Sequence, residues 1–108
     1  IEFNPILQNR FMIKKRTDDE KLKAFLCQFD ETILTIDGHS NAFMGLINTP
    51  LDGYKAVYSK AIIIDNLMRE DCMDLATAEE FVEYNIEGSY VGKKTPVLID
   101  IIPMLFWK

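Results

Sequence analysis

The sequence holds few side chains of the kinds that catalyse reactions, and its single histidine is the first to consider. His39 lies in the polar run DGHSN at positions 37–41. A metal site needs three or four ligands at a recognisable spacing, and nucleophilic catalysis by Ser40 or Cys27 needs a base within a known signature. Neither pattern occurs. We therefore expect His39 to lie in a surface turn and predict no catalytic residue, no metal site and no cofactor.

Asn85 is the polar residue least expected from its surroundings, because it continues an apolar helical stripe. The stripe consists of Leu75, Ala78, Phe81, Val82 and Asn85. A buried amide without a partner costs about 1–3 kcal/mol, so we expect Asn85 to hold the backbone of the 88–96 loop. The alternative is that Asn85 faces a pocket. In that case a small ligand or nucleotide would bind at this loop, and the protein could be an enzyme; the residues concerned would be Asn85, Tyr90, Lys93 and Thr95.

Three glutamates spaced by four residues, Glu79, Glu83 and Glu87, form an acidic ridge along the same predicted helix. The net charge of the chain is −5, yet residues 69–87 contain seven acids and one arginine. This region would repel a phosphate backbone and attract a basic surface. We therefore predict a protein partner with a basic surface and disfavour nucleic acid. The simpler interpretation is a solvated helix face.

The end of the chain offers a second contact candidate in Phe106 and Trp107, within the apolar segment Met104–Lys108. Chain ends are usually polar unless they are docked. We expect this tail either to pack back on the sheet or to bury against another chain, which would make a homo-oligomer.

The composition indicates one domain over residues 1–108, with residues 1–16 as an N-terminal extension that could be helical. The chain is 48% hydrophobic and 27% charged, as in ordinary globular proteins. No apolar run approaches membrane-spanning length, so we expect no membrane partner. Cys27 and Cys72 lack CxxC spacing, which favours a reduced, cytoplasmic location.

Helix signals occur at four places. Asn4-Pro5 predicts a helix over 5–14, with an extended arm through 11–13 as the alternative. Thr17 and Glu20 match a capping box before an apolar stripe that ends at Phe29. Ser59 is expected to cap a helix that runs to Glu70, and Asp74 or Thr77 caps the next. Gly88 would end that last helix in the left-handed conformation.

Strand signals fall between these helices. The segments predicted to be strands are Thr32–Ile36, Ala42–Ile47, Tyr54–Tyr58 and Pro96–Ile102. Turn residues follow the first at Asp37-Gly38 and precede the third at Pro50–Gly53. The predicted fold is α+β, with a small antiparallel sheet of about four strands and helices packed on one face.

Positions 80–96 read EFVEYNIEGSYVGKKTP, and positions 29–33 read FDETI. The segment from Phe29 to Ile99 resembles a family of small, acidic, uncharacterised bacterial and phage proteins with the motif E-(Y/F)-x-x-(Y/F)-N-(V/I)-x-G-(A/S)-(Y/W)-V-G-x-x-T-P. The chain departs from that family's pattern at Cys72, Ala76, Thr77 and Glu79. The resemblance implies a phage or mobile-element protein. With the acidic ridge, it favours a non-enzymatic protein that occupies a partner, for instance as an inhibitor of a host or defence factor.

Overall fold

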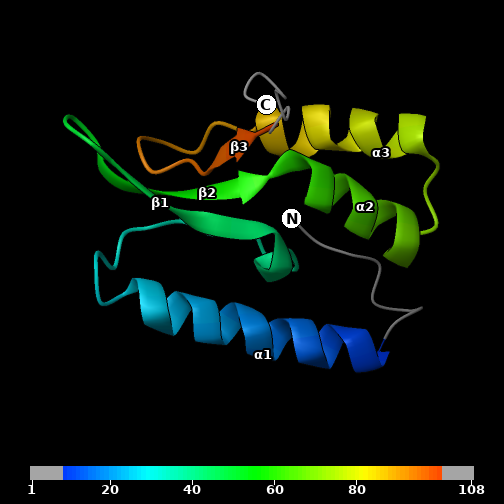
Figure 1. Cartoon of the computed structure of the whole chain (residues 1–108), viewed down its shortest axis with the longest axis horizontal. Coiled ribbons are helices and arrows are strands. Elements are labelled where there is room, and N and C mark those ends of the chain that lie inside the picture. Colours follow the sequence, from blue (N-terminus) through cyan, green and yellow to red (C-terminus); the bar gives the residue numbers. More distant parts are fainter. Residues whose placement is uncertain (1–8, 101–108) are drawn as a thin grey trace, which may run out of the picture.

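A computed structural model describes residues 9–100 (Figure 1). It contains a long helix, a β-hairpin, two consecutive helices and a short final strand. The elements in chain order are α1 (Asn9–Leu26), the 3₁₀ turn η2 (Ser40–Ala42), β1 (Phe43–Thr49), β2 (Gly53–Ser59), α2 (Lys60–Glu70), α3 (Leu75–Val82), the π-helical turn η3 (Glu83–Glu87) and β3 (Val97–Ile99). The predicted α+β class is confirmed.

Within residues 9–100 the sheet has three strands in the order β1-β2-β3 and is mixed. β1 and β2 form an antiparallel hairpin, whereas β3 pairs parallel with β2, Val57 opposite Val97. The prediction of about four antiparallel strands is therefore wrong in two respects. The chain reaches β3 through α2 and α3, and a crossover through helices brings a strand back in the parallel direction. The predicted strand Thr32–Ile36 is irregular backbone.

The hairpin turn follows the prediction from Pro50 and Gly53. The Thr49 hydroxyl donates to the Gly53 carbonyl over 3.0 Å and accepts from the Asp52 N–H over 3.2 Å. Gly53 has φ +73°, a backbone region that favours glycine. This turn fixes the register of β1 on β2.

One helix, α1, replaces the two that the sequence predicts before residue 30. Residues 9–14 are helical as predicted, so the extended alternative for 11–13 is wrong; the predicted start at Asn4-Pro5 lies outside the described residues. Thr17 is inside α1, and the predicted capping box does not start a helix. The stretch from Lys14 to Glu20 contains neither glycine nor proline, so nothing interrupts helix propagation.

The predicted N-caps of α2 and α3 are confirmed. The Ser59 hydroxyl accepts from the Ile62 N–H over 3.3 Å, and the Asp74 carboxylate accepts from the Thr77 N–H over 2.8 Å. The predicted left-handed Gly88 is wrong, because its φ is −76°. A side chain there would instead meet the Glu83 carbonyl oxygen at 3.0 Å, so contact rather than φ favours glycine.

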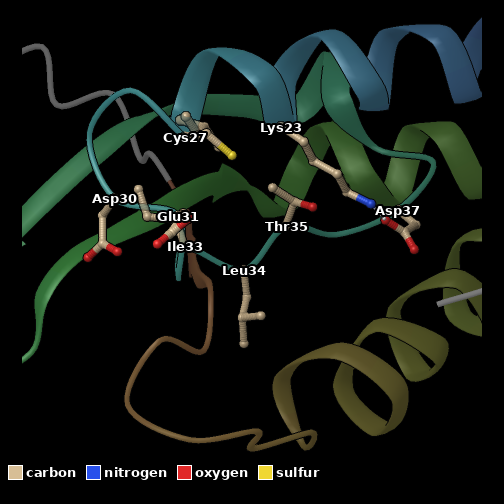
Figure 2. A pocket seen from close by; sticks show the side chains of 9 residues that line it. Lys23, Cys27, Asp30, Glu31, Ile33, Leu34, Thr35 and Asp37 are labelled. Carbon is tan, nitrogen blue, oxygen red and sulfur yellow. Dashed lines mark ion pairs between the residues drawn. The ribbon is translucent and has the colours of Figure 1, made fainter.

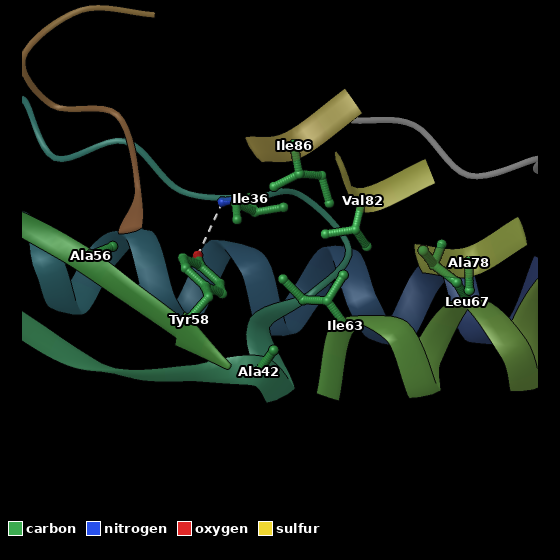
Figure 3. Close-up of a cluster of buried hydrophobic side chains, with 9 residues drawn as sticks. All are labelled: Ile36, Ala42, Ala56, Tyr58, Ile63, Leu67, Ala78, Val82 and Ile86. Carbon is green, nitrogen blue, oxygen red and sulfur yellow. Dashed lines mark hydrogen bonds between the residues drawn. The ribbon is translucent and has the colours of Figure 1, made fainter. Parts of the chain in front are cut away.

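The core gathers side chains from η2, β2, α2, α3 and η3 together with the irregular segment before η2 (Figure 3). Its buried members are Ile36, Ala42, Ala56, Tyr58, Ile63, Leu67, Ala78, Val82 and Ile86. The Tyr58 hydroxyl lies inside this cluster and accepts a 3.0 Å hydrogen bond from the Ile36 N–H. That bond holds the 33–36 segment on the sheet without strand pairing.

None of the helices within residues 9–100 is long and apolar enough to cross a membrane.

Candidate functional site

The acidic face, defined by Glu79, Glu83 and Glu87, is exposed as its helical spacing predicts. Glu87 differs from the other two, because its carboxylate lies 2.6 Å from the Lys60 ammonium. Hydrogen bonding to Glu87 raises the pKa of Lys60. Tyr84, which follows Glu83 in the chain, is 75% exposed.

Asn85 does not occupy the buried position predicted for it. Its side chain is exposed, and Nδ2 donates to the Phe81 carbonyl over 3.1 Å rather than to the 88–96 loop. η3 has i→i+5 hydrogen bonding, with the Gly88 N–H donating to Glu83 over 2.9 Å. This turn holds more residues than an α-helical one. Asn85, three residues after Val82, therefore points away from the core, and Ile86 is buried instead.

The 88–96 loop is organised by Thr95 rather than by Asn85. The Thr95 hydroxyl donates to the Gly92 carbonyl over 2.6 Å and accepts from the Val91 N–H over 3.0 Å. Both hydrogen bonds are local, so Thr95 shapes the loop. Tyr90 is 77% exposed and Lys93 is also exposed.

A cavity of about 310 Å³ opens between η3, the 88–96 loop and the segment before η2. We call it the loop pocket. Its lining residues are Leu34, Thr35, Ile36, Asn85, Ile86, Ser89, Val91, Thr95 and Pro96. Of the four predicted ligand-binding residues, Asn85 and Thr95 line this cavity, whereas Tyr90 and Lys93 do not.

Lys94 joins the 88–96 loop to the turn after α1. Its ammonium lies 2.9 Å from the Asp30 carboxylate and 3.0 Å from the Tyr54 carbonyl. Asp30 also accepts from the hydroxyl and the N–H of Thr32, over 2.6 and 2.8 Å. These Thr32 and Lys94 hydrogen bonds hold the pKa of Asp30 well below its usual range. The D-x-T spacing after α1 favours the local turn in which the Asp30 carboxylate accepts from Thr32, but it does not indicate the contact with Lys94.

A second cavity of about 300 Å³ lies beside the end of α1 (Figure 2). Lys23 on α1 and the exposed Cys27, just after the end of α1, both line it, and the Lys23 ammonium lies 3.2 Å from the Asp37 carboxylate. Among the described residues that line this cavity, neither the Cys27 thiol nor the Lys23–Asp37 ion pair indicates a particular ligand.

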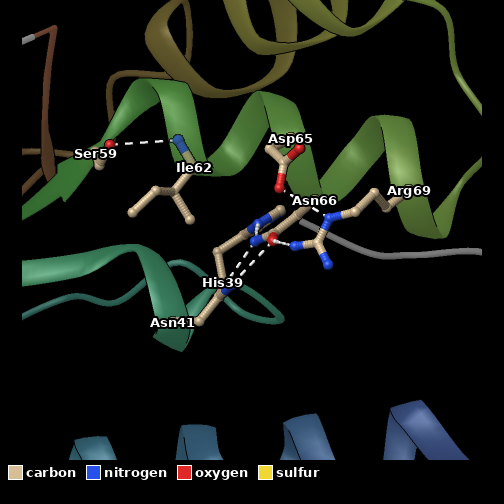
Figure 4. Close-up of polar contacts among 7 residues, drawn as sticks. All are labelled: His39, Asn41, Ser59, Ile62, Asp65, Asn66 and Arg69. Carbon is tan, nitrogen blue, oxygen red and sulfur yellow. Dashed lines mark hydrogen bonds and ion pairs between the residues drawn. The ribbon is translucent and has the colours of Figure 1, made fainter.

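His39 is buried, so the prediction of a surface turn is wrong. The ring nitrogen Nδ1 lies 3.1 Å from the amide nitrogen of Asn66, which can only donate, so Nδ1 accepts (Figure 4). Asn66 is fully buried and exchanges two hydrogen bonds with Asn41, over 2.8 and 2.9 Å. This network holds η2 against α2. It indicates a structural histidine rather than a catalytic one.

No group of three or more His, Cys, Asp or Glu side chains that could hold a metal ion occurs within the part of the chain that the structure describes. The predicted contact residues Phe106 and Trp107 lie outside the described residues.

The chain matches no family model, no curated protein and no solved structure.

Proposed function

We propose that this chain is a small non-enzymatic protein that binds a partner through α3 and η3. The supporting observation is the exposed Tyr84 ring, flanked by exposed glutamates on a segment whose opposite side is buried. Residues 75–87 contain four glutamates and no basic residue. A tyrosine within a polar rim is typical of residues that dominate binding energy at protein interfaces.

The electrostatics favour a partner with a basic surface. Lys60 pairs with Glu87, which leaves Glu79, Glu80 and Glu83 as the exposed carboxylates of this segment. Charged groups of this kind mainly speed association and select the partner, and their effect weakens as salt is added. Tyr84 would supply most of the affinity. The phage-type resemblance is compatible with a host protein as the partner.

The test is affinity capture from the native host, read by mass spectrometry, with the charge of the face reversed. Glu79→Lys combined with Glu83→Lys removes the attraction and leaves the Lys60–Glu87 pair in place. Tyr84→Ala removes the aromatic contact. The matched control is Glu20→Lys with Glu31→Lys, because both glutamates are exposed and the net charge changes equally.

We expect the wild type and the control to capture the same protein in a salt-sensitive complex. The charge-reversed variant and Tyr84→Ala should lose it. Retention of the partner by both of these variants, or no protein enriched by the wild type, would overturn the proposal.

A further inference from the structure

The loop pocket combines apolar walls with uncharged polar groups. Five of its nine lining residues are apolar and the other four are threonine, serine or asparagine. Its volume of about 310 Å³ lies at the lower end of the range for small-molecule sites. Such sites typically have an apolar lining with a few convergent polar groups.

Three of the polar groups retain hydrogen-bonding capacity. Asn85 uses one N–H on the Phe81 carbonyl, which leaves its oxygen and its second N–H. Within residues 9–100, the hydroxyls of Thr35 and Ser89 form no hydrogen bond with other protein groups. They come from separate segments, and both residues line this cavity; Thr35 also lines the cavity beside α1. A ligand here could therefore be held by both donors and acceptors.

The π-helical turn is an independent indication of a site. Single π turns are rare and are frequent at functional positions. Here the turn places Asn85 at the cavity while Ile86, the next residue, is buried in the core. A regular helix with Asn85 on the buried stripe would not present this amide to a ligand.

The charges around the cavity decide which ligand fits. None of the described residues that line it is charged. Lys94 is held by Asp30 and Tyr54, and Lys93 is not part of the lining. A phosphate group in the cavity would lack a cation, so an uncharged ligand fits better than a nucleotide.

We propose that the loop pocket binds a small uncharged heterocycle whose edge carries both a hydrogen-bond donor and an acceptor. This is the chemistry of a free nucleobase or its nucleoside. An asparagine amide offers the matching pair of groups. The proposal is independent of partner binding through Tyr84 and the acidic face.

The test is titration of the ¹⁵N-labelled full chain with uracil, uridine and uridine monophosphate, and with the corresponding adenine series. We expect a base or a nucleoside of one series to shift the backbone amides of 34–36 and 85–95. The monophosphate of that series should bind no more tightly. Asn85→Ala and the isosteric Thr35→Val should each weaken binding about three- to tenfold, the value of one neutral hydrogen bond.

Tyr84→Ala is the matched control, because it changes the same turn outside the cavity. It should keep nucleoside binding and lose the protein partner, whereas Asn85→Ala should show the reverse, so the two proposals fail separately. Should Asn85→Ala not fold, Thr35→Val gives the comparison. The inference is overturned if no probe shifts these amides at millimolar concentration, if the monophosphates bind more tightly, or if neither cavity variant weakens binding.

Discussion

At the residue scale, Tyr58 connects the sheet to the irregular segment that borders the loop pocket. Its ring is fully buried and packs edge-to-face on Phe43, with the ring centroids 5.7 Å apart. Its hydroxyl accepts the Ile36 N–H. Burial is the largest cause that raises the pKa of Tyr58, to about 12. One phenol thus fills the core and satisfies a backbone donor that has no strand partner.

Tyr58→Phe should lower the free energy of unfolding by about 1–3 kcal/mol at neutral pH, because the buried Ile36 N–H loses its acceptor. Urea unfolding monitored by circular dichroism measures this. An unchanged midpoint would show that the hydrogen bond contributes nothing.

The same variant tests the pH dependence. Unfolded Tyr58 ionises near 10.0, whereas the folded residue stays neutral until about 12. Ionisation therefore favours the unfolded wild type across that window, and its stability falls as pH rises, by about 1.4 kcal/mol per pH unit. The stability gap between wild type and Tyr58→Phe should narrow from pH 10 to 12. A constant gap would contradict the raised pKa.

At the element scale, the segment from α3 to η3 shows how a change of helix type selects which side chains face outward. Gly88 closes the π turn and packs against its carbonyls, where a Cβ would lie 3.0 Å from Glu83 O and 3.1 Å from Tyr84 O. The turn and the glycine therefore depend on each other.

Gly88→Ala should destabilise the protein by about 1–3 kcal/mol, the usual range for overpacking, because backbone atoms have to move. It should also shift the amide resonances of Asn85 and Ile86. The control is Ser89→Ala, an exposed neighbour, which should change stability little. Equal effects of the two substitutions would argue against a tight contact at Gly88.

Local signals in the sequence predicted the elements that local interactions form, namely the caps at Ser59 and Asp74 and the turn at Pro50–Gly53. These local signals gave wrong predictions for segments whose conformation depends on contacts between residues far apart in the sequence. The run 32–36, which is rich in β-branched residues, is irregular backbone held by Tyr58 rather than a strand. The exposure of Asn85 depends on one widened turn, which helical periodicity does not reveal. The loop pocket is formed by three segments that are separate in the sequence. Of the four residues predicted to bind a ligand, therefore, only Asn85 and Thr95 line it.

At the scale of the whole molecule, the Asp30–Lys94 clamp joins segments that are far apart in the chain. It fastens the loop before β3 to the turn after α1, and both side chains are mostly buried.

Asp30→Asn and Lys94→Met should each destabilise the protein. The double variant should lose less stability than the sum of the two single variants' losses, because each single substitution already removes the same contact. The control is Lys93→Met, an exposed neighbour. Thermal unfolding of the four variants and the wild type measures the coupling. Stability losses that are strictly additive would show that the Asp30–Lys94 ion pair contributes nothing to stability.

The clamp also predicts an acid dependence. Asp30 titrates below its ordinary value of 3.8 in the folded protein, so its contribution to stability is complete above that pH. As pH falls below 3.8, the unfolded state takes up a proton first and the contribution is lost. The difference in stability between wild type and Asp30→Asn should therefore shrink below pH 3.8. A difference that grows on acidification would contradict this.

The parallel β2–β3 pairing has a consequence for how the chain folds. The β1–β2 hairpin closes over a few residues, whereas β3 has to return from Val97 to Val57 with only three residue pairs to hold it. Because closing that long loop costs entropy, we expect β3 to pair after α2 and α3 have formed. We therefore expect the β3 amides and the 88–96 loop to exchange hydrogen earliest. The loop pocket and the Lys94 clamp would then be the last parts of the molecule to assemble and the first to open.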